Sequence, residues 1–383
     1  MKYNLKFDDI SLNCKVSDKD VLNFAKAYFT PFFTISRGYQ EDSIVEIEVV
    51  IHPTLIGEYP DKEHILIDGS KGFLSTTGIV LNDGVTREVV LMPTKTLVNI
   101  DKASKRISII GSSPDNVKIP LLRVIEDLTQ IEVERRGGVF IHASGIVIDD
   151  SVVLSVGDKG AGKTSFLCNS LASFHCQKLT NDNAVLYLKN EVVMVMGWPS
   201  FFKIELGTIA HSELLANFFP DEEIALLDTP TRLWDKKIDK VPLYPREGAL
   251  KLRSDILSKG QLHTIVFPMF SLEDIGCEPT NLDAKTFFER LQSNLQGSFN
   301  SKHSNWHNYN EVSRDAITSS LENISNVMSK QCESYKINWG PSFSQLITEV
   351  NLMKTVSKSF TKAKANKSDP QERWPGIPAI KSL

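Results

Sequence analysis

The chain has 383 residues, of which 41% are hydrophobic and 23% are charged, and its formal net charge at pH 7 is −4. This length exceeds what one average hydrophobic core holds, so we expect at least two domains. The slightly acidic balance lacks the basic footprint of a protein that binds nucleic acid or an anionic membrane surface. Neither nucleic acid nor membrane is therefore an expected partner.

Targeting and redox features indicate a cytoplasmic protein. No apolar stretch approaches the roughly 20 residues that a transmembrane helix needs. The first residues do not have the pattern of a signal peptide. The five cysteines are scattered and form no C-x-x-C pair, which favours a reducing compartment over a disulfide framework or a zinc site.

Residues 1–134 are predicted to form a β-rich accessory domain. Helical periodicity is confined to 18–28 and 116–135, and the second of these helices ends at the stop signal Gly137-Gly138. Elsewhere, short apolar runs alternate with Gly, Pro, Asn and Asp, as at 43–51, 88–92 and 106–110. The long second helix is expected to link this domain to the next.

A β-hairpin is predicted at the start of a second domain, which spans residues 135–300. Two apolar runs, 139–148 and 152–156, flank Asp149-Asp150, which we take as the central turn residues. In that register His142 lies opposite Gly157. The hairpin therefore brings an imidazole to the segment that begins at Gly157.

That segment, Gly157-Asp158-Lys159-Gly160-Ala161-Gly162-Lys163-Thr164, matches the phosphate-binding pattern G-x-x-x-x-G-K-[ST]. Its glycines let backbone N–H groups face the phosphates, its lysine reaches the β/γ oxygens, and its threonine is a Mg²⁺ ligand. Apolar residues at helical spacing follow the loop, and a helix N-terminus favours anions. We therefore expect a nucleoside triphosphate and Mg²⁺ as ligands, with contacts from residue 157 through Ser165.

The rest of the chain alternates strands and helices. Strands are expected at 184–188, 192–196 and 264–268, a helix at 212–228, and an amphipathic helix over 287–299. Residues 301–383 are predicted to form a helical extension. It begins with a polar loop over 301–310, continues with helices at 312–330 and 342–358, and ends in a loose tail rich in Lys and Pro.

Two other classes of nucleotide-binding protein fit the sequence poorly. A GTPase needs N-K-x-D after an apolar strand, and the only match, at 366–369, lies in the polar tail. The segments 257–261 and 225–228 partly match the signature motifs of ABC-type ATPases. They come in the wrong order, and the glutamate that should follow is missing.

The stretch from His142 to Asp182 resembles the HPr kinase/phosphorylase superfamily, particularly its HPr kinase-related branch. The matching segments are 140–147, 157–164, Lys178-Leu-Thr-Asn-Asp182-Asn183-Ala-Val and Gly197-Trp198-Pro199. The resemblance is firm over 137–200 and loose over 200–300. It implies an α/β fold, α+β over the whole chain. The P-loop kinase core would resemble HPr kinase and phosphoenolpyruvate carboxykinase, behind a β-rich N-terminal domain.

The resemblance also implies roles for single residues. Lys163 and Thr164 would hold phosphates and Mg²⁺, His142 would lie beside the γ-phosphate, and Asp182 would contact the metal and deprotonate the acceptor. Asn183 stands where the family has a second aspartate, and the glycine-rich signature that follows in true HPr kinases is absent. The resemblance therefore implies the forward reaction, with a substrate other than HPr itself.

Several residues compete with these candidates. Asp182 also fits an ordinary turn, and His142 an ordinary half-buried strand, while Asp228 ends an apolar run and competes as metal ligand. The pair His303 and His307 has i, i+4 spacing within a loop. Basic side chains that could contact phosphates or an acidic acceptor, though they also fit a solvated face, are Lys236, Lys237 and Arg246.

The leading hypothesis is a kinase that transfers the γ-phosphoryl group of ATP to an acceptor hydroxyl, a serine of a peptide or a small molecule. The first domain would help to select that acceptor. A nucleotide-regulated switch without acceptor chemistry is the alternative from another class. A carboxykinase-like decarboxylation is disfavoured because the extra metal ligands and arginines are not found. The acceptor and the oligomeric state, homo-oligomers included, stay open.

Overall fold

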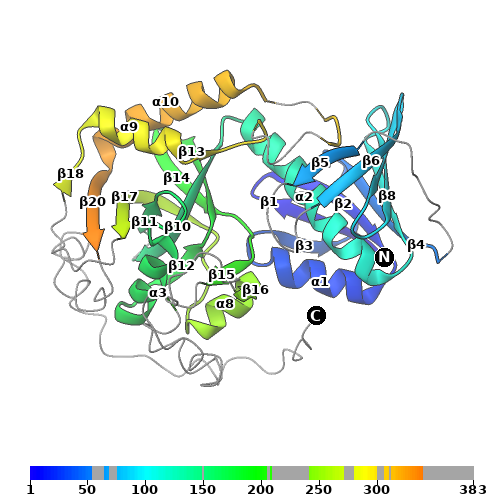
Figure 1. Ribbon diagram of the computed structural model, residues 1–383, viewed down its shortest axis with the longest axis horizontal. Helices are drawn as coiled ribbons and strands as arrows, with labels where there is room; N and C mark the ends of the chain where they lie inside the picture. The colour runs from blue at the N-terminus through cyan, green and yellow to red at the C-terminus, as the bar shows by residue number, and fades with distance from the viewer. Residues whose placement is uncertain are drawn as a thin grey trace.

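The chain folds as two lobes, each built around a large β-sheet, in a mixed α/β arrangement (Figure 1). The computed structural model describes residues 1–53, 64–68, 76–148, 151–204, 208, 241–270, 280–299, 306–309 and 312–339. No helix within these ranges is long and apolar enough to cross a membrane.

The first lobe is a nine-stranded sheet in the order β3-β1-β2-β4-β9-β8-β7-β6-β5. Its strands are β1 (Lys2–Phe7), β2 (Ile10–Val16), β3 (Thr34–Arg37), β4 (Glu46–Ile51), β5 (His64–Asp68), β6 (Thr76–Asp83), β7 (Thr86–Leu91), β8 (Thr96–Asp101) and β9 (Arg106–Gly111). Inward-facing positions alternate with half-exposed ones, as in Ile47 and Val49 of β4. The β-rich character expected from the sequence is confirmed.

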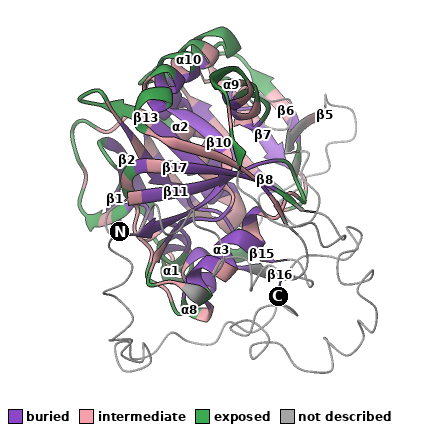
Figure 2. Ribbon diagram, turned by 90° about the vertical axis from the view of Figure 1, so that its left-hand side faces the viewer, coloured by how far each residue is buried: buried purple, intermediate pink, exposed green. Residues whose placement is uncertain are grey.

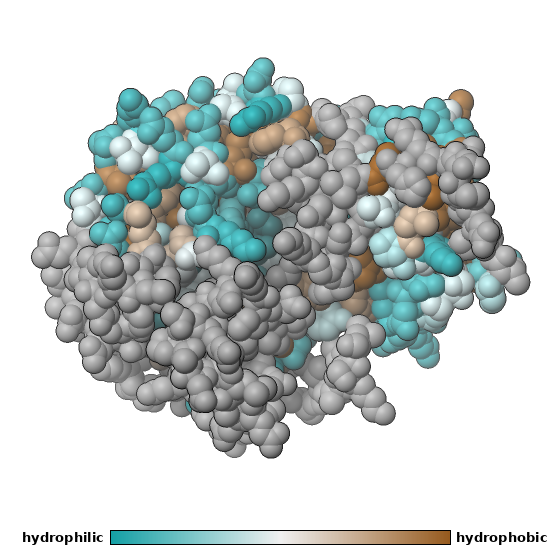
Figure 3. Space-filling view, in the orientation of Figure 1, coloured by the Kyte–Doolittle hydropathy of each residue, from teal (hydrophilic) through white to brown (hydrophobic). Residues whose placement is uncertain are grey.

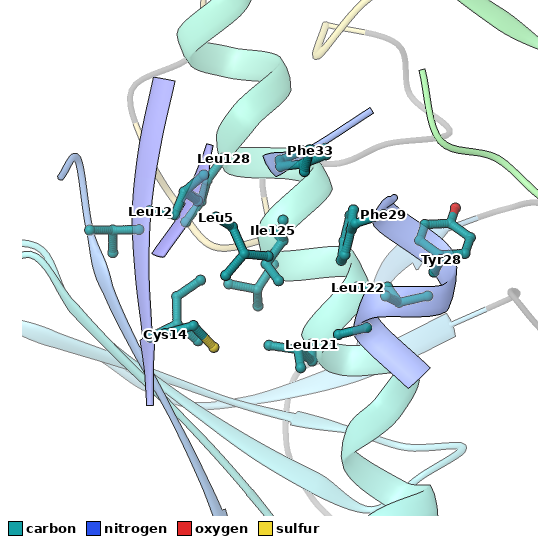
Figure 4. Packing of buried hydrophobic residues seen from close by; sticks show 14 of the residues in the cluster. Leu5, Leu12, Cys14, Tyr28, Phe29, Phe33, Leu121, Leu122, Ile125 and Leu128 are labelled. Carbon is teal, nitrogen blue, oxygen red and sulfur yellow. The ribbon is translucent and has the colours of Figure 1, made fainter. Parts of the chain in front are cut away.

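Two helices cover the apolar side of this sheet. Helix α1 (Lys19–Phe29) starts after Asp18, whose carboxylate accepts from two N–H groups of the first turn. Helix α2 (Pro114–Arg135) starts after Ser113, whose hydroxyl accepts from the Asn116 N–H. Both match the predicted helices. The first core lies between them and the sheet, where Leu5, Leu12, Phe29 and Ile125 pack closely (Figure 4).

The second lobe continues directly from α2 through Gly137-Gly138. Its strands are β10 (Val139–Ile148), β11 (Ser151–Val156), β12 (Gln177–Thr180), β13 (Asn183–Lys189), β14 (Val192–Gly197), β15 (Phe202–Ile204), β16 (Val241–Leu243), β17 (Lys259–Phe270), β18 (Thr280–Asn281), β19 (Leu295–Gln296) and β20 (Glu333–Trp339). Its helices are α3 (Lys163–Ser173), α8 (Pro245–Lys251), α9 (Ala284–Ser293) and α10 (Arg314–Gln331). Strands β10, β11, β13, β14 and β17 close a ring of pairings whose strands are largely buried (Figure 2).

The predicted hairpin register is confirmed. The pairs run from Ile148 opposite Ser151 to Ala143 opposite Val156, where the ladder ends. The expected pair of His142 with Gly157 is not formed, because the His142 N–H donates to the Asn294 carbonyl oxygen at 2.9 Å. The turn residues Asp149 and Asp150 lie outside the described part of the chain. The strands expected at 184–188, 192–196 and 264–268 are also present as β13, β14 and part of β17.

The two lobes share one apolar cluster. Trp198, directly after β14, is 5% exposed. Its ring centroid lies 5.1 Å from that of Phe7 in the first lobe and 4.9 Å from that of Phe140 in the second. A Cβ atom at the preceding Gly197 would meet the Leu179 carbonyl oxygen at 2.4 Å. Only glycine therefore allows the backbone at position 197 to approach that carbonyl so closely.

Polar contacts from α2 add to this connection. The Glu134 carboxylate accepts from the backbone N–H and the hydroxyl of Ser298, at 3.0 and 2.5 Å. The Asp127 carboxylate accepts from the indole N–H of Trp306 at 2.8 Å, and the Arg87 side chain donates to the Trp306 carbonyl. The first lobe is therefore attached along the length of α2, beyond the single covalent connection.

The amphipathic helix predicted over 287–299 is too long. Helix α9 ends at Ser293, and Leu295 lies instead in β19, which pairs with Phe140 and Ile141 of β10. A short apolar segment suits either a helix or a strand, and the open edge of β10 decides between them. The predicted helix at 312–330 is confirmed as α10. Those at 212–228 and 342–358, and the tail, lie outside the described residues.

The described surface is mainly hydrophilic on the second lobe in the view of Figure 3. Exposed large hydrophobic side chains of the described residues are spread over the chain rather than gathered in one segment, at Met1, Val85, Leu188, Leu250 and Met269. Single exposed apolar residues are normal for a folded protein.

Candidate functional site

The glycine-rich loop connects β11 to α3, so the strand–loop–helix order expected around it is present. Gly160 and Gly162 have φ angles of +84° and +99°. These left-handed values strain residues that carry a Cβ atom. The glycines of the motif are thus explained by backbone geometry, which turns the chain sharply into the helix.

The N-terminus of α3 is open to an anion. Its N-cap residue, Gly162, provides no side-chain hydrogen bond, and the first turn carries no acidic residue. The N–H groups of a first helical turn and the positive end of the helix dipole favour a phosphate at this position. The local sequence therefore suits the ligand expected from the motif.

Lys163, the first residue of α3, is 7% exposed and folds back over the loop. Its ammonium group donates to the Gly157 carbonyl at 2.6 Å and to the Asp158 carbonyl at 3.0 Å. Thr164 follows and is half-buried, and the Ser165 hydroxyl lies 2.8 Å from that of Thr208. The positive charge is consequently held at the loop, within reach of any group that the loop binds.

Strand β10 carries His142 and also contacts the helix that follows the glycine-rich loop. The buried Ser144 hydroxyl donates to the Lys163 carbonyl oxygen at 2.8 Å, which attaches the start of α3 to β10. His142 lies two positions earlier on the same strand, so its side chain leaves the same face. The imidazole therefore faces the side of β10 that holds the loop.

Asp182 lies beside the same strand, in the bend between β12 and β13. The Thr180 hydroxyl closes this bend by donating to the Asn183 carbonyl at 2.5 Å, and the Ala143 N–H donates to the Asp182 carbonyl at 3.0 Å. The carboxylate Oδ1 lies 3.3 Å from Nε2 of His142. The side chains of His142 and Asp182 are 24% and 49% exposed, so both can reach a bound molecule.

These contacts gather at the point where β10 changes neighbours on both edges. On one edge β19 pairs up to Ile141 and β11 takes over at Ala143. On the other edge β13 pairs up to His142 and β12 takes over at Gly145. The loop after β11 and the bend before β13 both start there.

A magnesium ion complexed with phosphates fits this arrangement. Across the described residues no group of three or more His, Cys, Asp or Glu side chains is placed to hold a metal. Mg²⁺ does not require such a cage, because it keeps several waters and usually binds one or two carboxylates together with substrate phosphates. The hydroxyl of Thr164 and the exposed carboxylate of Asp182 are donors of the appropriate kind.

Three buried residues near the site were not singled out from the sequence. Ser144 attaches α3 to β10, and Asn181 donates to the Ser200 hydroxyl and the Phe201 carbonyl. Lys178 is fully buried beneath Phe202, with its ammonium group 4.6 Å from the ring centroid. Burial lowers the pKa of Lys178 to about 7. Nothing in the sequence around these polar residues indicates which distant groups they contact.

The remaining candidates from the sequence lie elsewhere. Arg246 is half-buried in α8. His307 is buried against α2, where its Nδ1 accepts from the Tyr309 N–H and burial lowers its pKa to about 4. Asp228, Lys236, Lys237 and His303 lie outside the described residues. Phe201 and Phe202, which follow Gly197-Trp198-Pro199 in sequence, are core residues, at 7% and 0% exposed.

Comparisons with known proteins add little. No family model matches the chain, and no curated protein matches it. Among solved structures the chain is similar to the Hpr(Ser) kinase/phosphatase from Coxiella burnetii, at 13% identity and a TM-score of 0.25. The likeness covers 57% of this chain and 99% of that one. At this TM-score it carries no weight for the reaction, which must be inferred from the site itself.

Proposed function

We propose that the protein is an ATP-dependent kinase that transfers the γ-phosphoryl group to a hydroxyl of a peptide or small molecule. One observation carries this proposal. The His142–Asp182 pair and the start of α3 are attached to the same three-residue stretch of β10, residues 142–144, through the Ala143 amide and the Ser144 hydroxyl. The phosphate-binding loop and the carboxylate that would activate the acceptor are therefore attached to the same short part of β10.

The loop residues would bind and orient the triphosphate. Backbone N–H groups of the loop and of the first turn of α3 hold the phosphate oxygens, and Lys163 moves from the loop carbonyls to the β/γ oxygens. When bound, Mg²⁺ would neutralise phosphate charge, with Thr164 and Asp182 as its protein ligands. Phosphoryl transfer has a loose transition state, so positioning and charge neutralisation account for most of the catalysis.

Asp182 would prepare the acceptor. The acceptor oxygen forms a bond to the γ-phosphorus as the bond to the β–γ bridging oxygen breaks, ADP leaves, and the hydroxyl proton passes to the Asp182 carboxylate. His142, 3.3 Å from that carboxylate, orients it towards the γ-phosphate. Asn183 provides no second carboxylate, so we propose the forward direction only.

The test combines binding and turnover. Titration calorimetry with Mg·ATP measures binding, and [γ-³²P]ATP with pooled serine peptides and hydroxylated small molecules measures transfer. Lys163→Ala should lower the rate by about 10²–10³-fold, the effect of removing one electrostatic stabiliser. Asp182→Asn should still bind ATP and lose about 10²–10⁴-fold in transfer. Lys189→Ala, an exposed lysine of the same lobe, is the matched control.

Each outcome has a definite meaning. Loss of transfer in both variants, with the control active, supports the kinase. ATP binding without transfer to any acceptor would favour the nucleotide-regulated switch. If the wild-type protein does not bind ATP, the glycine-rich loop is a turn without a nucleotide ligand, and the proposal is overturned.

A further inference from the structure

The first lobe reaches the candidate site through Tyr28, at the C-terminal end of α1. We propose that Tyr28 is a positioning residue for Asp182, acting through residues 198–201 and Asn181. This inference rests on the proposed function, and it deepens that proposal because it makes the first lobe part of the transfer machinery.

Tyr28 contacts residues 198–201 with both its hydroxyl and its ring. The hydroxyl lies 3.4 Å from the Pro199 carbonyl oxygen, and the ring centroid lies 4.9 Å from that of Phe201. The side chain is 3% exposed, so these contacts are shielded from water. The position of the segment 198–201 therefore depends on a residue of the other lobe.

Glu126 of α2 fixes the Tyr28 hydroxyl in turn. The two oxygens lie 2.7 Å apart. A hydroxyl has one proton and here two acceptors, Glu126 and the Pro199 carbonyl. Burial raises the pKa of Glu126 to about 7, so near neutral pH a protonated Glu126 can donate to Tyr28 while Tyr28 donates to Pro199. Both protonation states keep the tyrosine in place.

The same segment is also bound by the bend that carries Asp182. The Asn181 amide group donates to the Ser200 hydroxyl at 3.1 Å and to the Phe201 carbonyl at 3.3 Å. Asn181 is 6% exposed, and Asp182 is the next residue. Residues 198–201 are thus in contact with both Tyr28 and the bend.

Tyr28 and Asp182 are also close enough to interact electrostatically. Burial raises the pKa of Tyr28 well above its usual value, and the negative charges of Glu126 and Asp182 raise it further. A shift of Asp182 by about 1 Å can cost up to about 10²-fold in rate, because transfer depends on near-attack geometry. Losing the Tyr28 hydroxyl alone, with the ring retained, should cost about tenfold.

The experiment compares Tyr28→Phe with Tyr3→Phe. Tyr3 lies in the same core, 4% exposed, and its hydroxyl contacts Met1 rather than the second lobe. The first readout is hydrogen exchange of the Ala143 amide in the free protein, because this amide donates to the Asp182 carbonyl. The second is transfer from [γ-³²P]ATP, measured as kcat and as KM for ATP.

We expect Tyr28→Phe to speed Ala143 exchange and to lower kcat about tenfold, with KM for ATP unchanged, while Tyr3→Phe alters neither. Asn181→Ala, at the other end of the contacts, should behave like Tyr28→Phe and serves if that variant folds poorly. Unchanged exchange in both variants would overturn the inference, and so would faster exchange with wild-type kcat. If the wild type transfers no phosphate, the proposed function fails, and the exchange result still decides whether Tyr28 holds the bend.

Discussion

Replacing Trp198 with alanine should destabilise the protein and loosen both lobes at their interface. The indole is 5% exposed and contacts aromatic rings of both lobes, Phe7 and Phe140. An alanine leaves a cavity that neither sheet can close, because each is fixed by its own strand pairing. The loss is therefore expected on both sides of the interface.

The magnitude follows from burial. A buried tryptophan removes about 200 Å² from water, which at about 25 cal/mol per Å² corresponds to about 5 kcal/mol. Alanine retains a small part of this, so we expect a loss of about 4 kcal/mol, within the usual range for Trp→Ala. With an unfolding entropy of about 2.1 cal/mol/K per residue over 383 residues, this loss lowers Tm by about 5 °C.

Urea unfolding followed by far-UV circular dichroism measures the stability loss, and native-state hydrogen exchange shows where protection is lost. Phe267→Ala is the matched control, because Phe267 is 1% exposed but packs on Phe287 within the second lobe alone. It should lower stability similarly while leaving exchange around Phe7 at its wild-type rate. A Trp198→Ala loss below about 1 kcal/mol, or unchanged exchange around Phe7, would refute the shared core.

Further substitutions test the loop, two buried titratable groups and the site pair. Gly162→Ala, at a φ of +99°, should cost about 1–3 kcal/mol in stability and weaken ATP binding measured by calorimetry. The folded-state pKa of Glu126 is raised from 4.5 to about 7, so its contribution to stability is lost as pH rises through that window. Glu126→Gln should flatten this part of the urea-stability profile. The pKa of His307 is lowered from 6.5 to about 4, so its contribution is present above 6.5 and lost as pH falls towards 4, a loss that His307→Gln should remove. His142→Gln combined with Asp182→Asn should cost no more transfer activity than Asp182→Asn alone, and fully additive losses would contradict a shared role.

Local patterns were sufficient for much of the fold. The hairpin register follows from apolar runs and a two-residue turn, and the pairs Ile148–Ser151 through Ala143–Val156 agree with it. Helices α1 and α2 carry their own start signals, Asp18 and Ser113. The glycines of the loop need left-handed backbone, which the motif already implies.

Contacts between distant segments could not be predicted in this way. No pattern around Trp198 indicates a core position, yet it belongs to an apolar cluster that includes residues near the start of the chain. Tyr28 and Glu126 are ordinary positions of amphipathic helices, and only the packing of α1 on α2 and on the second lobe gives them a role. The error at Leu295 has the same origin, because the edge of β10 lies far away in sequence.

The candidate site lies where strand β10 changes the strands with which it pairs. A strand that keeps the same two neighbours along its length pairs its backbone groups in two uninterrupted ladders. Here both neighbours change around residues 142–145, so the loop from β11 and the bend before β13 meet there. The short polar side chain of Ser144 attaches α3 at this point, and the Ala143 amide attaches the Asp182 bend. Residues 198–201, which contact both Tyr28 and that bend, bring the first lobe to the same place. Under the proposed function, an acceptor hydroxyl bound by the first lobe would arrive beside the Asp182 bend, so tests of that function include Tyr28 and Trp198 as well as Lys163 and Asp182.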